Sequence, residues 1–286
     1  MKNRKTFVAQ VFAGAMIFGS AALQPAIAKE WKSVTIGTEG AYAPWNLTKS
    51  DGKLDGFEVE LVKDLCGRMK IECKIITQDW DSAIPSLNAG KYDVLMDAVS
   101  ITPERQKVID FSVPYASTPA TFAAVKGSDA AKLPGTGTEL ALTGDAAHDK
   151  PLVEKLRAAL KGKSIGIQTA TVYTKFITDN FSDIADIRDY KTAAEHDLDL
   201  AAGRIDYAFD DATYFLTAFQ NKGNENLTLA GPQIGGSIWG PGEGFGFRKS
   251  DTDLRDMFSK AIKSAIADGT VKKLSLQWFK VNVTPH

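Results

Sequence analysis

Apolar positions along the chain follow two alternating patterns, one typical of strands and one typical of helices. From residue 33 onward, short β-branched runs alternate with longer stretches whose apolar residues recur every three or four positions. The pattern predicts strands at 33–38, 73–77 and 92–96, with helices after Gly56 and at 80–89. Strands separated by helices predict a parallel sheet with helices on its faces.

The same order of elements returns further along the chain. The pattern predicts strands at 163–167, 184–190 and 205–209, and helices at 172–180 and 193–202. Segments 87–93 and 200–206 also match in form, because both end a helix with glycine and enter a strand through an aspartate. This weak internal symmetry favours an α/β protein of two similar lobes.

Two irregular regions interrupt this order. Residues 126–150 contain many Gly, Ser, Thr and Asp residues without clear periodicity, so we interpret them as a surface insertion, followed by a helix at 151–160. The second region, 231–246, is rich in glycine. Helices are expected after it at 254–267 and 271–279, and the last of these is expected to pack on the first lobe.

The irregular regions also suggest where the chain passes between the lobes. We expect crossings near residues 117–120 and within 233–244, where glycines suit a segment that changes its backbone angles. The predicted division is residues 29–118 with 240–286 in lobe 1, and 119–239 in lobe 2.

The first 28 residues have the parts of a secretory signal peptide. A basic start is followed by a mostly apolar stretch at 7–23 and by the small-x-small pattern Ala26-Ile27-Ala28. We expect cleavage after Ala28 and export to the periplasm. The alternative, a membrane anchor, is disfavoured because the apolar stretch is shorter than the ~20 residues of a membrane span.

Charge excludes one class of partner. The chain has 34 basic and 35 acidic side chains, and Lys2, Arg4 and Lys5 are the only charged residues of the signal region. The remaining chain therefore has 31 basic and 35 acidic residues and a formal charge of -4. Without a basic block to neutralise phosphates, we expect no nucleic-acid binding.

The two cysteines are consistent with export. Cys66 and Cys73 have six residues between them, too many for a redox pair, and no histidines cluster nearby to complete a metal site. In an oxidising compartment a local disulfide is the natural interpretation. The alternative is a pair of free buried thiols.

One short run combines a helix start with a cation. Thr102 is a suitable N-cap, Pro103 suits the first helical position, and Arg105 offers a bidentate grip on a carboxylate. The alternative is an ordinary capped helix with a solvated arginine.

Other predicted strands end in polar or small residues as well. In α/β sheets, ligands bind at the carboxyl ends of the strands. The residues at these ends are Glu39 and Tyr42, then Asp97, Ala98 and Ser100, then Thr169 to Thr171, and finally Asp211. We expect these strand ends to face one cleft.

Several motifs resemble those of a known family. The supporting segments are IGTEGAYAPW (36–45), LDGFEVEL (54–61), Cys66 with Cys73, SITPERQ (100–106), FSVPY (111–115), GRID (203–206) and residues 268–279. On these residues the chain resembles the periplasmic binding proteins for polar amino acids, in particular binders of lysine/arginine/ornithine, histidine and opines. Residues 134–160 and 276–280 look most like the octopine and nopaline binders. The resemblance implies a two-lobed type II fold, in which each lobe is a mostly parallel sheet flanked by helices and the ligand lies in the interlobe cleft.

The resemblance also implies ligand-binding roles for individual residues. Arg105 would hold an α-carboxylate, helped by Ser100 and by backbone donors near Thr171, and Asp211 would take the α-ammonium. Tyr42 and Trp80 would form an aromatic wall, Glu39 would bind a distal cation, and Gln168 belongs to the same set. For Trp80 the alternative is a core position, because its segment is also the apolar face of a helix.

Three positions depart from the pattern of the basic-amino-acid binders. Asp97 and Ala98 stand where those binders carry serines, and Asp97 would favour a cation if it points inward. Val172 replaces a common threonine and leaves only its backbone N–H for a carboxylate.

The implied function is capture of a small amino-acid-like ligand by hinge closure, for delivery to the permease subunits of an ABC transporter in the inner membrane. We expect a monomer without cofactor, metal or catalytic residues. One alternative is a sensor that reports the solute to a receptor. The other is a periplasmic dehydratase, for which Glu39, Asp97 and Asp211 are formally available as acids or bases. His148, His196 and His286 are interpreted as loop, helix-surface and tail residues.

Overall fold

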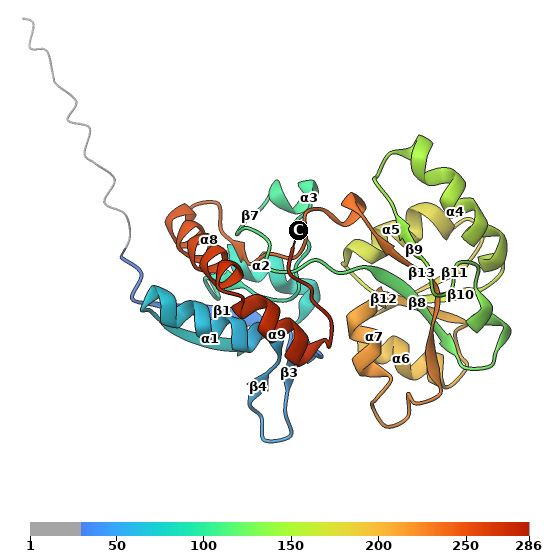
Figure 1. Cartoon of the computed structure of the whole chain (residues 1–286), viewed down its shortest axis with the longest axis horizontal. Coiled ribbons are helices and arrows are strands. Elements are labelled where there is room, and N and C mark those ends of the chain that lie inside the picture. The colour runs from blue at the N-terminus through green and yellow to red at the C-terminus, as the bar shows by residue number, and fades with distance from the viewer. Residues whose placement is uncertain (1–29, 286) are drawn as a thin grey trace, which may run out of the picture. The chain divides into compact units, whose positions relative to one another are not determined.

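The computed structural model describes residues 30–285 and contains two separate main sheets. The expected signal peptide and His286 lie outside the described residues. Figure 1 shows the elements of each sheet gathered with their own helices, and the chain passing between the two groups. This arrangement agrees with the expectation of two α/β lobes.

The first sheet has five strands in the order β5-β1-β6-β14-β7. Its strands are β1 (Ser33–Thr38), β5 (Glu72–Thr77), β6 (Val94–Leu95), β7 (Asp110–Phe111) and β14 (Gly246–Phe247). β1 runs parallel to β5 and β6, whereas β14 is antiparallel to β6 and β7. The predicted strands at 33–38 and 73–77 are confirmed within one residue.

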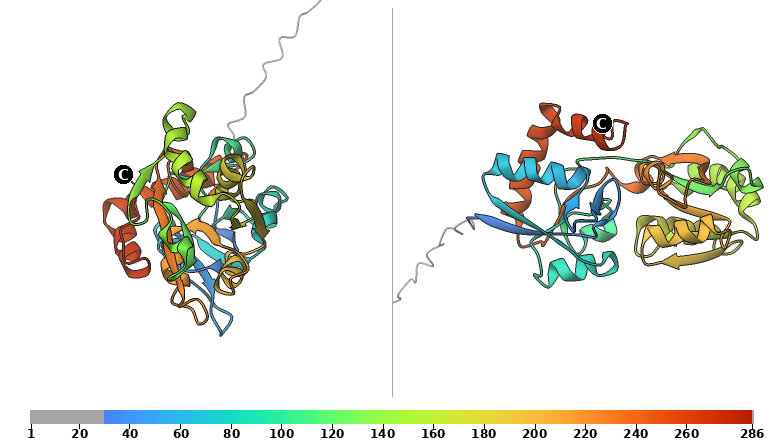
Figure 2. Two further views of the ribbon diagram at one scale, coloured as in Figure 1. Left: turned by 90° about the vertical axis from the view of Figure 1, so that its right-hand side faces the viewer. Right: turned by 90° about the horizontal axis from the view of Figure 1, so that it is seen from below.

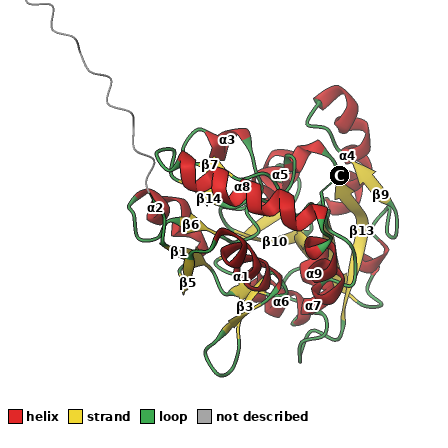
Figure 3. Cartoon of the chain, turned by 60° about the vertical axis from the view of Figure 1, so that its left-hand side comes forward, coloured by secondary structure: helices red, strands yellow, loops and turns green. Residues whose placement is uncertain are grey.

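Helices cover both faces of this sheet. They are α1 (Phe57–Met69), α2 (Ala83–Asn88), α8 (Thr252–Ala267) and α9 (Thr270–Trp278), with the short α3 (Pro103–Gln106) and a 3-10 turn at Trp80–Ser82. Figure 3 shows α1, α8 and α9 together, and their apolar faces share one core with Val94 and Met96. Leu95 faces the other way and packs with α2 residues, as alternation along a strand requires. The expected packing of the last helix on the first lobe is confirmed.

A small antiparallel sheet extends the first lobe. It consists of β2 (Ala41–Tyr42), β3 (Asn46–Thr48) and β4 (Leu54–Asp55). Gly56 joins it to α1 with a φ of 124°, and a Cβ there would lie 2.5 Å from the Trp45 carbonyl oxygen. Only glycine fits this close approach, which packs the start of α1 against the backbone of Trp45.

The second sheet has six strands in the order β11-β10-β12-β8-β13-β9. They are β8 (Ala120–Val125), β9 (Glu139–Ala141), β10 (Ser164–Gln168), β11 (Asp186–Tyr190), β12 (Tyr207–Asp211) and β13 (Leu227–Gly235). β10 is parallel to β11 and β12, and β8 is antiparallel to β12 and β13. The helices are α4 (Ala146–Leu160), α5 (Val172–Phe181), α6 (Ala193–Ala201) and α7 (Ala212–Ala218), with 3-10 turns at Asp129–Lys132 and Ser237–Trp239.

The region interpreted as an irregular insertion is more ordered than the sequence pattern indicated. β9 pairs in parallel with β13, and α4 begins at Ala146 instead of residue 151, because Asp145 caps it by accepting from the Ala147 N–H at 2.9 Å. Pro151 therefore lies inside the helix and does not start it. The glycine-rich region is also strand up to Gly235, because its backbone pairs with β8 and β9.

Two segments carry the chain between the sheets. One joins β7 to β8 and the other joins β13 to β14, and they meet in an antiparallel bridge between Ala116 and Glu243. Figure 2 shows them as a green and an orange segment between the two lobes. The Ser117 N–H also donates to the Val283 carbonyl at 2.8 Å, which holds the C-terminal segment beside this hinge.

The expected disulfide is present. Cys66 on α1 and Cys73 on β5 are bonded, with their Cα atoms 6.3 Å apart. The alternative of two free thiols is therefore wrong. The bridge ties the end of α1 to the edge strand of the first sheet.

Candidate functional site

A cavity of about 460 Å³, including its open side, lies where both lobes and the second crossing meet. It is lined by Glu39, Tyr42, Trp45, Trp80, Asp97, Ala98, Ser100, Arg105, Gln168, Thr171, Val172, Tyr173, Asp211 and Glu243. The fold thus brings together all ten side chains that the sequence singled out as ligand-binding candidates.

Strand ends place most of these residues. Glu39 follows β1, Asp97 follows β6, Gln168 ends β10, and Asp211 ends β12. The parallel strands of each sheet therefore deliver their carboxyl ends to the cavity, as in other open α/β sheets. Asp211 also caps α7, accepting from the Thr213 N–H at 2.7 Å and the Tyr214 N–H at 2.9 Å.

Arg105 supplies the positive charge of the cavity wall. Thr102 caps the short helix α3 and accepts from the Arg105 N–H at 3.2 Å. The guanidinium donates only to carbonyls, those of Ser100 at 3.0 Å and Ala170 at 3.4 Å, and it lies 5.3 Å from the centre of the Trp80 ring. Within residues 30–285 it forms no ion pair, and burial lowers its pKa to about 10, which leaves it charged at neutral pH.

Arg105 is half-buried, and its guanidinium lies beside the Trp80 ring in the cavity wall, so it differs from the freely solvated arginine of the alternative. The group retains donors that are free to face a carboxylate.

Two carboxylates lie at another side of the cavity. Glu39 accepts from Gln168 Nε2 at 3.0 Å, and Asp97 Oδ1 accepts from Asn46 Nδ2 at 3.0 Å. Burial, opposed by the Gln168 bond and assisted by Asp210, raises the pKa of Glu39 to about 7. Burial, followed by the charges of Glu39 and Glu58, raises the pKa of Asp97 well above its ordinary range.

Asp97 is one of the residues that line the cavity. It is 5% exposed, and its Oδ2 has no hydrogen-bond partner in the described part of the chain. Buried carboxylates without a cation raise each other's pKa, and a cation between them relieves this. The pair is therefore suited to a positively charged group.

Direct contacts across the cleft hold the lobes together around the cavity. Trp80 Nε1 donates to the Thr169 carbonyl at 3.1 Å, and Tyr42 Oη donates to Asp210 Oδ1 at 2.5 Å. The Tyr42 ring also stacks on Tyr214 with centroids 4.8 Å apart and planes 6° apart. The indole of Trp80 is thus partly exposed, lines the cavity and reaches the second lobe. It also packs against an apolar cluster of the first lobe, so it combines the core position with the cavity position.

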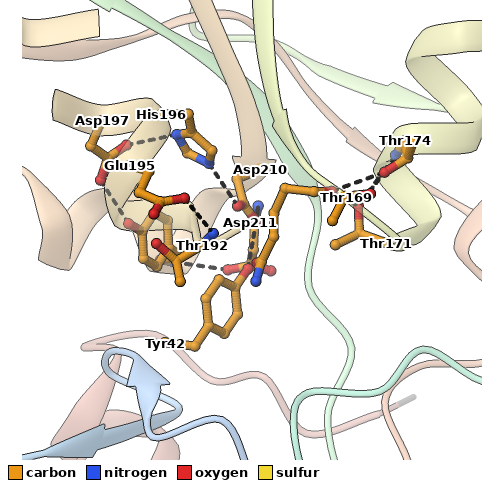
Figure 4. A network of polar contacts seen from close by, with 12 residues as sticks. Tyr42, Thr169, Thr171, Thr174, Thr192, Glu195, His196, Asp197, Asp210 and Asp211 are labelled. Atoms are coloured by element: carbon orange, nitrogen blue, oxygen red, sulfur yellow. Dashed lines mark hydrogen bonds and ion pairs between the residues drawn. The ribbon is translucent and has the colours of Figure 1, made fainter. Parts of the chain in front are cut away.

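A buried histidine lies behind the Tyr42 contact and corrects one expectation. His196 was interpreted as a helix-surface residue, but its side chain is fully buried. Its Nε2 lies 3.2 Å from Asp210 Oδ2, and its Nδ1 lies 3.0 Å from Asp197 Oδ1 in an ion-pair contact without hydrogen-bond geometry. Figure 4 shows His196 between the two aspartates, with Tyr42 reaching toward Asp210.

The two carboxylates of this network favour the protonated form of His196. Burial alone would lower the pKa of His196, but the contacts with Asp197 and Asp210 outweigh it and raise the pKa from 6.5 to about 9. An imidazolium held between two carboxylates fixes Asp210 as the acceptor for Tyr42 of the other lobe. His148 differs from its expected setting too, because it lies in α4 and not in a loop.

Four cavity residues were not among the ten side chains proposed as ligand contacts, although the backbone N–H of Val172 was considered for a carboxylate. Val172 and Tyr173 begin α5 directly after Thr171, and Trp45 belongs to the 36–45 motif, so proximity to assigned residues was an available signal for these three. Glu243 lies among the glycines of the second crossing. Its sequence neighbours gave no signal, because only the crossing of the chain places it at the cavity.

Two features are absent from residues 30–285. No group of three or more His, Cys, Asp or Glu side chains in this range is arranged to hold a metal ion. Among the described helices, none combines the length and the apolar character that a membrane crossing demands.

Known proteins resemble this chain in sequence and in structure. Residues 34–281 match the family described as "Bacterial extracellular solute-binding proteins, family 3". The "Octopine-binding periplasmic protein" of Rhizobium meliloti is 42% identical over 277 residues, which cover 91% of this chain and 94% of that protein.

Solved structures show the same fold. An ancestral arginine-binding protein bound to arginine has a TM-score of 0.73 at 26% identity, covering 87% of this chain and 98% of that one. A periplasmic His/Glu/Gln/Arg/opine family-binding protein from Silicibacter pomeroyi, in complex with lysine, has a TM-score of 0.69 at 32% identity, covering 88% and 100%. The two-lobed type II fold expected from the motifs is confirmed.

Proposed function

Because this chain belongs to the bacterial extracellular solute-binding proteins, family 3, we propose that it captures a basic amino acid or an opine in the periplasm and delivers it to an ABC importer. The observation that carries the proposal is the charge pattern of the cavity, in which Arg105 has no carboxylate partner while Glu39 and Asp97 have no cation among the described residues. A ligand with a carboxylate at one end and a cationic group at the other matches this pattern.

Each end of such a ligand has a counterpart. Arg105, with the hydroxyl of Ser100 and the backbone N–H groups at the start of α5, takes the α-carboxylate. Asp211 lies near the α-ammonium. The side chain passes between Tyr42 and Trp80, and its guanidinium or ammonium reaches Glu39, Asp97 and Gln168.

Delivery requires that the lobes open and close. We take residues 29–118 with 240–286 as one body and 119–239 as the other, with the two crossings as the hinge. A ligand that contacts both bodies stabilises the closed form by its differential affinity for that form. The closed form is the state that permease subunits in the inner membrane would receive, and a monomer suffices for this.

The first test is a thermal-shift screen of refolded, ligand-free protein from residue 29 onward against amino acids, opines, sugars and prephenate. A ligand at 100 times its Kd stabilises by roughly 2.7 kcal/mol, or about 5–10 °C in Tm for a chain of this size. Shifts confined to basic amino acids or opines, with the ligand recovered unchanged, support the proposal. A shift with sugars alone, or conversion of prephenate, contradicts it.

The second test separates the cationic end. Glu39→Gln should weaken the binding of arginine about 10- to 100-fold and the binding of its neutral isostere citrulline far less. Only arginine loses a charge-assisted hydrogen bond. Asp129→Asn is the matched control, since its carboxylate is 99% exposed and pairs only with Lys132. If arginine and citrulline lose affinity equally, Glu39 does not bind the cationic end of the ligand.

A further inference from the structure

Glu243 lies in the second crossing between the lobes and is one of the residues that line the cavity. Its backbone forms antiparallel bridges with Ser100 and Ala116, so it is fixed to the first lobe. Gly242 beside it has a φ of 128°, and a Cβ there would lie 2.2 Å from the Ala116 carbonyl oxygen. This close backbone contact holds the crossing in place and directs the neighbouring carboxylate.

The hydrogen bonds around this carboxylate leave it with unused acceptor capacity. Asp211 Oδ1 accepts from the Thr213 N–H and hydroxyl and from the Tyr214 N–H, and its Oδ2 accepts from the Thr118 hydroxyl. Glu243 Oε1 lies 3.5 Å from the same hydroxyl oxygen. Because that hydroxyl has one proton and gives it to Asp211, Glu243 receives no full hydrogen bond from it.

The second oxygen of Glu243 has no partner at all within residues 30–285, although the side chain is only 5% exposed. A buried carboxylate without donors is costly, so it calls for a donor from outside the protein. Of the two carboxylates beside Thr118, Glu243 has far more free lone pairs for a ligand than Asp211.

The charges point to the kind of donor. Asp211 belongs to the second lobe and Glu243 is fixed to the first, so two carboxylates from opposite lobes approach one hydroxyl. Burial, then the charge of Asp211, raises the pKa of Glu243 well above its ordinary range, and Glu58 adds to this. Arg105 is the one basic side chain among the described residues that line the cavity. A cation between the two carboxylates would relieve their repulsion.

We propose that Glu243 is a specificity-determining residue that, jointly with Asp211 from the opposite lobe, binds the α-ammonium of the ligand. The site takes an ammonium that keeps at least two N–H donors, as a primary or secondary amine does, and discriminates against ligands without that nitrogen. Because the two acceptors come from different lobes, the same contact favours the closed form. This inference rests on the function proposed above, in which the ligand is amino-acid-like.

The test compares two probes in two proteins by isothermal titration calorimetry. The probes are L-arginine and 5-guanidinopentanoic acid, which has the same carboxylate and guanidinium but no α-nitrogen. The proteins are the wild type and Glu243→Gln, which keeps the shape of the side chain and removes its charge. We expect Glu243→Gln to weaken the binding of L-arginine about 10- to 100-fold, as expected for the loss of a hydrogen bond to a charged group. Binding of 5-guanidinopentanoic acid should change less than about twofold.

A second variant tests whether a change in folding explains the loss of binding. Glu243→Asp keeps the charge but withdraws it by one methylene, so it should retain part of the preference for L-arginine. Unchanged Tm values of the ligand-free variants would show that the fold is intact.

Each outcome decides one question. Equal weakening of both probes, or weakening of neither, by Glu243→Gln overturns the role of Glu243 while the proposed function stands. A wild-type protein that binds no basic amino acid or opine overturns the proposed function, and this inference with it.

Discussion

Replacing the buried His196 with glutamine is expected to destabilise the protein strongly at pH 6 and much less at pH 9. The imidazole lies 3.2 Å from Asp210 Oδ2 and 3.0 Å from Asp197 Oδ1. Asp210 also accepts from Tyr42 Oη and the Asp211 N–H, and Asp197 accepts from Tyr214 Oη. A glutamine has similar size but carries no charge, so both carboxylates would remain buried without their cation.

The magnitude follows from the pKa. The rise in the pKa of His196 from 6.5 to about 9 corresponds to roughly 3 kcal/mol of additional interaction with the protonated form. Removing one partner of a buried ion pair costs about 3–5 kcal/mol. We therefore expect the variant to lose about 3–5 kcal/mol of unfolding free energy at pH 6.

The direction of the pH dependence is set by the folded state binding the proton more tightly than the unfolded state. The stabilisation is fully present below the unfolded pKa of 6.5 and is lost as the pH rises through about 9. The wild-type protein should thus lose roughly 3 kcal/mol from this group over that window. Glu39 titrates in the same region with a pKa of about 7, but it is common to both proteins and cancels in their difference.

The assay is urea unfolding of ligand-free wild type and His196→Gln at half-unit steps from pH 6 to pH 9.5, followed by circular dichroism. The matched control is His148→Gln, since that ring is 52% exposed beside Asp149 and its loss should cost less than about 1 kcal/mol. If the free-energy difference between wild type and His196→Gln stays constant across this range, His196 is neutral in the fold and the reasoning is refuted.

Two further predictions concern the disulfide and the interlobe contact of Trp80. Replacing both Cys66 and Cys73 with alanine should lower the unfolding free energy by about 2.5 kcal/mol, as expected for opening so short a loop. Equal urea midpoints for the variant and the oxidised wild type would contradict this. Trp80→Phe keeps an aromatic ring for Arg105 but removes the donor to the Thr169 carbonyl, which should weaken ligand binding about 3- to 10-fold through loss of one hydrogen bond between the lobes. Unchanged affinity by calorimetry would mean that this bond does not stabilise the closed form.

Much of the fold follows from local patterns. The alternation of β-branched runs with amphipathic stretches predicts β1, β5, β10 and most helices within a few residues, because the hydrophobic period depends only on nearby positions. The errors occur where a local signal competes with tertiary pairing. Pro151 suggested a helix start, but the cap by Asp145 and the pairing of β9 with β13 ordered the preceding segment.

Part of the candidate site was likewise predictable from local sequence patterns. Glu39, Asp97, Gln168 and Asp211 were identifiable because they follow or end strands, and strand ends meet at one edge of a sheet. Arg105 was identifiable from its capped helix start. The family motifs assigned their roles, and the geometry places them around one cavity.

By itself, the sequence determined the strands, the helices and the residues at their ends, since each of these depends on positions a few residues apart. Only the tertiary structure decided which side chains meet across the lobes. Tyr42 and Asp210 are 168 positions apart, and Thr118 and Asp211 are 93 apart. The burial of His196 arises from the packing of α6 on β10 and β12, and the unused acceptors of Glu243 arise from the course of the second crossing. No local periodicity records either arrangement.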